Sequence, residues 1–242
     1  MCVIIKLTVL SKLRKKLILN NIENILSIFD VNTTIFTILN YPMSYIEFFG
    51  TLLNILSVYL VAKNKIWTWP IGNIAVVLFA ILFFQIQLYS DFFEQIYFFI
   101  TGFYGWWVWW NIKKNNKTKK ESPVTHTTQR ANITYAAIIL VGTLVLGFVM
   151  SHINEWLPTL FTMPASFPYL DAFTTVMSFA ATIMMANKKL ECWYLWILVD
   201  IIGIGLYFSK GVIFISLLYV IFLVLATKGL LNWRKLVAKT KS

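Results

Sequence analysis

The chain has 242 residues, of which 59% are hydrophobic and only 13% are charged, and its net charge is +11. Soluble domains are about 45–50% apolar and about 25% charged, so this composition excludes an ordinary soluble globular protein. The twenty Phe, ten Trp and eleven Tyr suit a bilayer protein, because aromatic side chains concentrate where a membrane meets water. We therefore predict an integral membrane protein whose basic residues set its topology and contact anionic lipid, rather than bind nucleic acid.

Residues 1–40 form an N-terminal extension without a clear signal peptide, because no small-residue cleavage site follows its basic cluster. Apolar residues recur at helical spacing between Leu10 and Phe29, which is typical of an amphipathic helix lying on a membrane surface. We expect this extension to contact lipid rather than to cross the bilayer.

Seven apolar segments follow, and each is long enough to cross the hydrocarbon as a helix, which takes about 20 residues. They are predicted at 45–62, 69–86, 91–111, 132–151, 169–187, 192–209 and 211–231. A hydrophilic linker, 112–131, separates three helices from four, and a basic tail, 234–242, ends the chain. The expected fold is an all-α membrane protein with seven transmembrane helices.

Lys and Arg gather in alternate connections. They occur after the first, third, fifth and seventh segments, whereas the connections after the second and fourth have none and that after the sixth has only Lys210. The positive-inside rule then places the linker 112–131 and the C-terminus in the cytoplasm. An odd number of spans places the N-terminus on the opposite, outer side, so we expect a multi-pass membrane protein.

An internal repeat relates the first three segments to the last three. A gapless shift of 124 residues aligns Trp69 with Trp193 and Trp109 with Trp233. Segment 132–151 has no counterpart, and such a linker helix gives two parallel three-helix repeats, at 45–111 and 169–233. Transporters built from repeats bind their substrate near the bilayer midplane between the halves, so the repeat favours transport.

The sixth segment carries the sharpest candidate site. Asp200 lies near its centre, where an ionisable side chain costs at least about 2.5 kcal/mol and is functional by default. Trp193, Trp196 and Asp200 are spaced i, i+3, i+7 and so share one helical face, which suits a flat cationic ligand. The alternatives are a hydrogen-bonded structural Asp and tryptophans of the interfacial belt.

Polar residues elsewhere in the apolar segments are further candidates. Asn54 and Ser178 occupy equivalent mid-membrane positions, where they either bind a ligand or hydrogen-bond one helix to another. Gln95 is predicted to point into the bundle and to act as a donor and acceptor. Asn73 and Gln85, near the two ends of the second segment, are weaker candidates.

Two acids in the same region receive a simpler interpretation. Asp91 and Glu94 are predicted to be an N-cap and a first-turn residue of the third segment, where they satisfy free backbone N–H groups and the helix dipole.

Motifs of catalysis are missing from the sequence, which has no G-x-S-x-G, H-E-x-x-H or phosphate-binding loop. His126 and His152 are both predicted in loops, so no metal cluster is expected. A retinal-type light sensor would need a lysine in mid-helix, whereas Lys210 is at a helix end. The sequence favours a carrier without cofactor or metal over an enzyme or a receptor.

Three stretches carry a family resemblance: "FFQIQLYSDFFEQ" (83–95), "YGWWVW" (104–109) and "FPYLDAFTTVMSFAATIMMANKKLECWYLWILVDIIGIGLYF" (167–208). They resemble the PnuC family of bacterial nicotinamide riboside transporters, and the similarity covers about 45–233. It implies a SWEET-like 3+1+3 arrangement, facilitated diffusion without ion or nucleotide coupling, trapping of the cargo by cytoplasmic phosphorylation, and assembly as a homotrimer.

The resemblance implies a site for a flat cationic pyridinium that carries an amide and a ribose. Trp193 and Trp196 would stack on the ring, and Asp200, where many relatives have Asn, would offset its charge. The amide and hydroxyls would bind Gln95, Asn54 and Ser178. Thiamine is also flat and cationic, so thiamine or another vitamin precursor is the alternative cargo.

Overall fold

The computed structural model describes residues 27–38, 41–86, 88–115, 124–161, 166–209, 211 and 213–241. Most of the extension for which we predicted a surface helix lies outside these residues. The described helices are α2 (Tyr45–Ala62), α3 (Thr68–Gln85), α4 (Tyr89–Asn115), α5 (Gln129–Trp156), α6 (Pro168–Ala186), α7 (Cys192–Ser209) and α8 (Ile213–Lys241). The predicted all-α fold with seven helices is confirmed.

Each helix follows from its local sequence. Ser44 caps α2 by accepting a hydrogen bond from the backbone N–H of Glu47 at 3.3 Å, and Thr128 caps α5 in the same way. Pro168 occupies the first turn of α6, where its missing N–H costs nothing. The residues predicted as a separate tail continue α8 as far as Lys241.

The surface of the bundle is apolar, as a membrane requires. Within the described residues, six helices are long and apolar enough to cross a bilayer, and α4, which is rich in Trp and Tyr, is not among them. Leu140, Val141 and Leu144 of α5 each expose more than half of their surface, which soluble proteins avoid in contiguous patches. The chain is therefore a multi-pass membrane protein.

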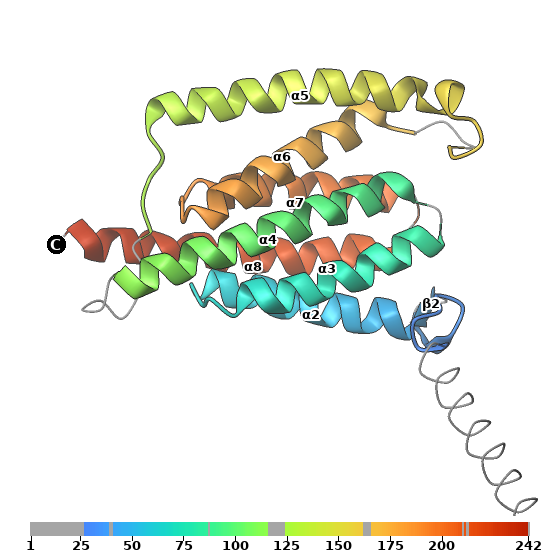
Figure 1. The fold of residues 1–242 in the computed structure, drawn as a ribbon, viewed down its shortest axis with the longest axis horizontal. Coiled ribbons are helices and arrows are strands. Elements are labelled where there is room, and N and C mark those ends of the chain that lie inside the picture. Colours follow the sequence, from blue (N-terminus) through green and yellow to red (C-terminus); the bar gives the residue numbers. More distant parts are fainter. Residues whose placement is uncertain are drawn as a thin grey trace, which may run out of the picture.

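The helix axes lie roughly along one common line, and within each group of three helices consecutive helices are antiparallel neighbours (Figure 1). In the first group α2 packs on α3 and α3 on α4, and in the second α6 packs on α7 and α7 on α8. The groups meet where α4 contacts α6 and where α2 contacts α8, while α5 packs on α6 at the edge of the bundle.

A short hairpin precedes α2, and the sequence patterns did not predict it. Strands β1 (Thr34–Ile38) and β2 (Tyr41–Ser44) pair antiparallel. The ring of Tyr41 stacks on Phe214 of α8 at 5.5 Å, and its hydroxyl donates to Glu47 at 2.7 Å. The hairpin is thereby fixed against the end of the bundle where α2 and α8 begin.

The two groups of helices correspond closely. A shift of 124 residues moves α3 onto the bounds of α7 and brings α2 and α4 within two residues of α6 and α8 at both ends. The turns correspond as well, because Asn64 and Lys188 both have left-handed backbone, with φ of 55° and 53°. Two equivalent halves would give this correspondence, although the parallel-repeat arrangement itself stays a prediction.

Two local interpretations were wrong. Helix α4 begins at Tyr89, so Asp91 lies inside its first turn and is not its N-cap. His152 lies in α5 rather than in a loop, because this helix continues to Trp156, beyond the predicted end of the apolar segment at residue 151.

Glycine is required where a tryptophan ring lies against the backbone of α8. A Cβ atom at Gly229 would lie 2.5 Å from the ring of Trp193, whereas a Cβ at Gly205 of α7 would meet nothing within 4 Å. We expect Gly229→Ala to destabilise the protein by about 1–3 kcal/mol, as overpacking does, and to lower the midpoint of thermal unfolding in detergent. Gly205→Ala is the matched control and should leave the midpoint unchanged. Equal midpoints for the two variants would contradict the close packing.

Candidate functional site

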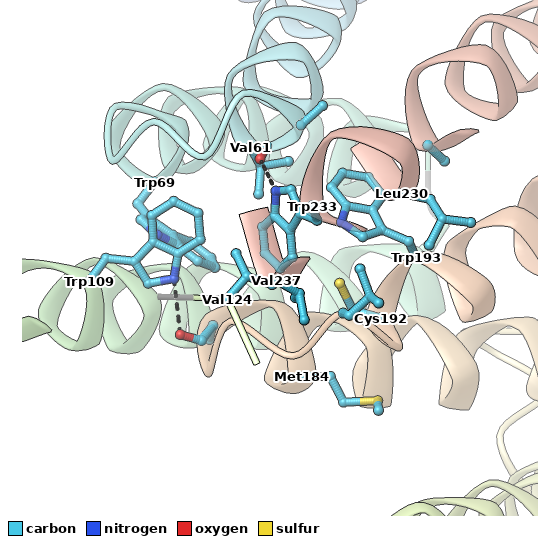
Figure 2. Packing of buried hydrophobic residues seen from close by; sticks show 14 residues of the cluster. Val61, Trp69, Trp109, Val124, Met184, Cys192, Trp193, Leu230, Trp233 and Val237 are labelled. Carbon is cyan, nitrogen blue, oxygen red and sulfur yellow. Dashed lines mark hydrogen bonds between the residues drawn. The ribbon is translucent and has the colours of Figure 1, made fainter. Parts of the chain in front are cut away.

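Four tryptophans pack together at one end of the bundle, and Figure 2 shows them. Trp69 and Trp109 meet edge to face with ring centroids 5.5 Å apart, and Trp193 and Trp233 do the same at 5.5 Å. Trp109 and Trp233 join the two pairs at 6.2 Å. Edge-to-face contacts between indoles contribute about 0.5–1.5 kcal/mol beyond the area they bury. We call these four residues the tryptophan cluster.

Hydrogen bonds from this cluster cross between the two groups of helices. Trp109 of α4 donates its indole N–H to the carbonyl of Ala186 at the end of α6, at 3.0 Å. Trp233 of α8 donates to the carbonyl of Val61 near the end of α2, also at 3.0 Å (Figure 2). Thus α4 of the first group binds the last turn of α6, and α8 of the second group binds the last turn of α2. The backbone carbonyls of a last turn have no hydrogen-bond partner within their own helix.

A buried lysine lies beside the cluster. Lys188 is only 1% exposed, its ammonium group is 3.4 Å from the ring centroid of Trp109, and it donates to the side-chain oxygen of Asn64. A cation over an indole face gains up to about 2 kcal/mol when both are desolvated. The contact therefore compensates part of the burial cost of the charge and ties the α6–α7 turn to the α2–α3 turn.

The linker before α5 covers the same end. Val124 is buried in contact with the cluster, and Thr125 pairs with the α6–α7 turn, donating to the carbonyl of Lys188 and accepting from the N–H of Leu190, both at 3.0 Å. One carboxylate oxygen of Glu191 lies 2.9 Å from Nδ1 of His126, and the other accepts from the Thr127 N–H. We call residues 124–127 the strap.

The electrostatics of the strap centre on Glu191, which lies outside the spanning helices. Partial burial tends to raise the pKa of its carboxyl group. Hydrogen bonds from His126 and Thr127 outweigh burial, so the pKa of Glu191 lies below its ordinary value. The carboxylate is thus held charged against the strap.

The structure places the predicted α7 residues inside the bundle. Trp193 is 1% exposed and belongs to the tryptophan cluster, so its ring is used in packing. Trp196, one turn further along, is half-buried, and its indole N–H is buried without a hydrogen-bond partner among the described residues. Asp200 is 4% exposed, and its side chain makes no hydrogen bond to any described residue.

Sequence neighbours of the candidates Ser178 and Asp200 pack together where α6 meets α7. Ser178 is buried, and its neighbour Met177 is in one apolar cluster with Trp196 and with Val199, the residue before Asp200. This part of the α6–α7 contact therefore carries a carboxylate, a hydroxyl and an indole N–H in apolar surroundings.

The remaining candidates lie elsewhere. Asn73 is buried where α3 meets Gly102 of α4, and Asn54 of α2 is half-buried. Gln95 lines an open, otherwise apolar groove of about 420 Å³ between α3 and α4. Gln85 donates to the carbonyl of Phe29 at 2.6 Å and accepts from the N–H of Val31 at 2.9 Å. The Gln85 amide thus holds the segment before the hairpin.

Sequence reasoning missed two stacked tyrosines beyond Asp200, one on α7 and one on α8. Tyr219 of α8 stacks on Tyr207 of α7 with ring centroids 5.4 Å apart, and its ring lies against Gly203, where a Cβ would come within 2.5 Å. Asp200, Gly203 and Tyr207 are spaced i, i+3, i+7, the same spacing that connected Asp200 to the tryptophans. That spacing was the available signal.

Known proteins resemble this chain along most of its length. Residues 44–235 match the family described as nicotinamide mononucleotide transporter. The nicotinamide riboside transporter PnuC of Escherichia coli (strain K12) is 28% identical over 208 residues, covering 80% of this chain and 86% of that protein. The riboflavin/roseoflavin transporter RibM of Streptomyces davaonensis is 25% identical, covering 84% and 91%. A crystal structure of the vitamin B3 transporter PnuC is similar with a TM-score of 0.62 and 26% identity, covering 92% and 90%.

The strap should make stability depend on pH. Because folding lowers the pKa of Glu191 below its ordinary value of 4.5, its contribution is fully present above about 4.5 and is lost as pH falls through the lowered pKa. We expect Glu191→Gln to lower the free energy of unfolding by at most about 1 kcal/mol at neutral pH and to have no effect in strong acid. Thermal unfolding across this range measures the difference. Glu155→Gln, which removes an exposed carboxylate at the end of α5, is the control. A deficit for Glu191→Gln that did not change with pH would contradict the pairing.

Proposed function

We propose, since the chain belongs to the nicotinamide mononucleotide transporter family, that it carries nicotinamide riboside across the inner membrane by facilitated diffusion. The family and the solved neighbour are transporters, so this chain is a membrane transporter and not an enzyme. The relative from Escherichia coli, named as a nicotinamide riboside transporter, supports this cargo.

One observation carries the choice of cargo: the buried carboxylate of Asp200, which makes no hydrogen bond to any residue that the structure describes. It lies in the middle of a spanning helix at 4% exposure, and the free indole N–H of Trp196 lies one turn away. Keeping an acid at this depth costs several kcal/mol unless a partner compensates it. A flat cationic ring would supply the missing charge and would stack on the indole, and nicotinamide riboside has such a ring.

Asp200 also separates the candidate cargos. Riboflavin, for which one relative is named as a transporter, is neutral and leaves the carboxylate uncompensated. Thiamine is flat and cationic and suits the same two side chains, so it is the second candidate. Ser178 on α6 and Asn54 on α2 are proposed to bind hydroxyls or the amide of the cargo, with Gln95, Asn73 and Gln85 as weaker candidates.

The proposed mechanism is alternating access between two three-helix bundles, 45–111 and 169–233, joined by α5. The tryptophan cluster ties the bundles at the end that carries Lys63, Lys189 and Arg234, which the positive-inside rule assigns to the cytoplasm. Opening toward the cytoplasm would then require the cluster and the Lys188–Asn64 contact to separate. Phosphorylation of the cargo inside the cell would prevent its return. The exposed faces contact lipid, and a homotrimer is the proposed assembly.

Charge compensation predicts how binding depends on the cargo. We expect Asp200→Asn to weaken binding of nicotinamide riboside by at least about tenfold, which is about 1.4 kcal/mol, and to affect its neutral dihydro form much less. Trp196→Ala should weaken binding of both forms by a similar factor, because both present a flat ring. Isothermal calorimetry in detergent measures the affinities, and Leu198→Ala, at an exposed position of α7, is the control. Equal losses of both forms in Asp200→Asn would indicate a structural Asp.

The cytoplasmic closure predicts a second outcome. In a background without Cys2 and Cys192, we expect Asn64→Cys with Lys188→Cys, joined by a short thiol reagent, to stop uptake because the bundles can no longer separate. Reduction of a cleavable cross-link should restore uptake.

The control for the cross-link stays within one bundle. Ser57 and Thr68, whose hydroxyl oxygens are 3.1 Å apart, connect α2 to α3, so cross-linked cysteines there should leave uptake intact. Full uptake by the Asn64–Lys188 cross-linked protein would disprove the proposed opening.

A further inference from the structure

Charge is strongly divided between the two ends of the bundle. Among the described residues, Lys and Arg occur only toward the end with the tryptophan cluster, where Glu191 is the one acid. The opposite end carries the acids Asp30, Glu47, Asp91, Glu94, Glu155 and Asp171. Lys210 and the basic residues before position 27 lie outside the described residues.

Three of these acids form a group. Asp91 and Glu94 lie in the first two turns of α4, Asp171 lies in the first turn of α6, and α4 packs on α6. All three carboxylates are half-buried and lie in the neighbourhood of the Tyr207 hydroxyl. We call Asp91, Glu94 and Asp171 the acidic mouth.

The acidic mouth is connected to the cargo site through the tyrosine pair. Tyr219 stacks on Tyr207 and packs against Gly203, one turn from Asp200. Asp91, Glu94 and Asp200 also lie in the neighbourhood of the Tyr219 hydroxyl. The two rings therefore lie between three acids at the end of the bundle and one deeper acid, and aromatic faces attract cations.

Helix stabilisation explains only part of this group. Acids in a first turn favour the helix dipole, which accounts for the positions of Asp91 and Asp171. It does not account for Asp200, which is buried in the middle of α7 and makes no hydrogen bond to a described residue. An uncompensated buried acid beside the same tyrosines points to a cationic ligand rather than to four independent helix effects.

We propose that Asp91, Glu94 and Asp171 select the charge of the cargo: they concentrate cationic heteroaromatic molecules at the outer end and deliver them past Tyr207 and Tyr219 to Asp200. The same field repels molecules with a phosphate group, so the acidic mouth favours a riboside over its phosphorylated nucleotide. This inference rests on the proposed transport function and names the residues that choose the charge.

The test measures association rates. Stopped-flow tryptophan fluorescence follows binding of nicotinamide riboside and of its neutral dihydro form to the full-length protein in detergent, at about 10 mM and about 1 M salt, where the screening length falls from about 30 Å to about 3 Å. We expect the association rate of the cation to fall about tenfold between these conditions, within the range known for charged clefts. The rate of the neutral form should not change.

Variants locate the effect. The triple change Asp91→Asn, Glu94→Gln and Asp171→Asn should lower the cation's association rate about tenfold at low salt, leave its dissociation rate unchanged and spare the neutral form. Glu155→Gln, an exposed acid at the same end, is the matched control. If the triple variant does not fold, each single change is measured, and each should lose part of the salt dependence.

The outcomes are distinct. An association rate of the wild-type protein that does not change with salt concentration would overturn the inference. Equal decreases in the association rates of the cation and the neutral form in folded variants would also overturn it, because they would indicate a structural role. Absence of any binding of nicotinamide riboside would instead disprove the proposed function. Tight binding of the nucleotide would exclude charge selection even if transport holds.

Discussion

The fold depends on the contact between two tryptophan pairs at one end of the bundle. In a membrane the hydrophobic effect does not drive helices together, so close packing and interhelical hydrogen bonds must hold them. Gly105 and Gly229 let the rings of Trp69 and Trp193 lie against backbone, and two indole N–H groups cross between the helix groups. The closure of the basic end, the position of the strap and the burial of Lys188 all follow from this contact.

The two halves differ in polarity although their helices correspond. The position equivalent to Asp200 in α3 is Val76, and that equivalent to Tyr219 in α4 is Gln95. Both halves supply two residues of the tryptophan cluster at equivalent positions, whereas the carboxylate of α7 occurs in one half only. Packing is therefore common to both halves, and the candidate chemistry belongs mainly to the second.

Much of the fold could be predicted from the sequence, because apolar length determines which segments form membrane helices. Aromatic matches at a spacing of 124 residues also identified the positions that pack the cluster. The hairpin at Thr34–Ser44 escaped prediction, since its apolar residues gave no clear alternation and its pairing depends on contacts with α2 and α8. The strap escaped too, because nothing local in a hydrophilic linker indicates that Val124 is buried.

A site residue could be predicted from the sequence only where the burial of its own side chain in the membrane was enough to identify it. Asp200 was recognisable, since an acid in mid-helix is rare whatever surrounds it. Trp193 looked equivalent to Trp196 in sequence, and only the degree of burial separates a ring inside the tryptophan cluster from a half-buried ring packed beside it. Gln85 and Gln95 looked alike in sequence as well. Gln85 makes two hydrogen bonds to the segment before the hairpin, whereas Gln95 lines a groove between α3 and α4. The spacing of residues along the sequence does not show which way each side chain points.

The indole bonds across the bundle have an evolutionary consequence, because both acceptors, at Val61 and Ala186, are main-chain carbonyls. No substitution at either position can delete the oxygen that receives the bond. The side chains at positions 61 and 186 can therefore change in the course of evolution while the docking of one helix group on the other persists.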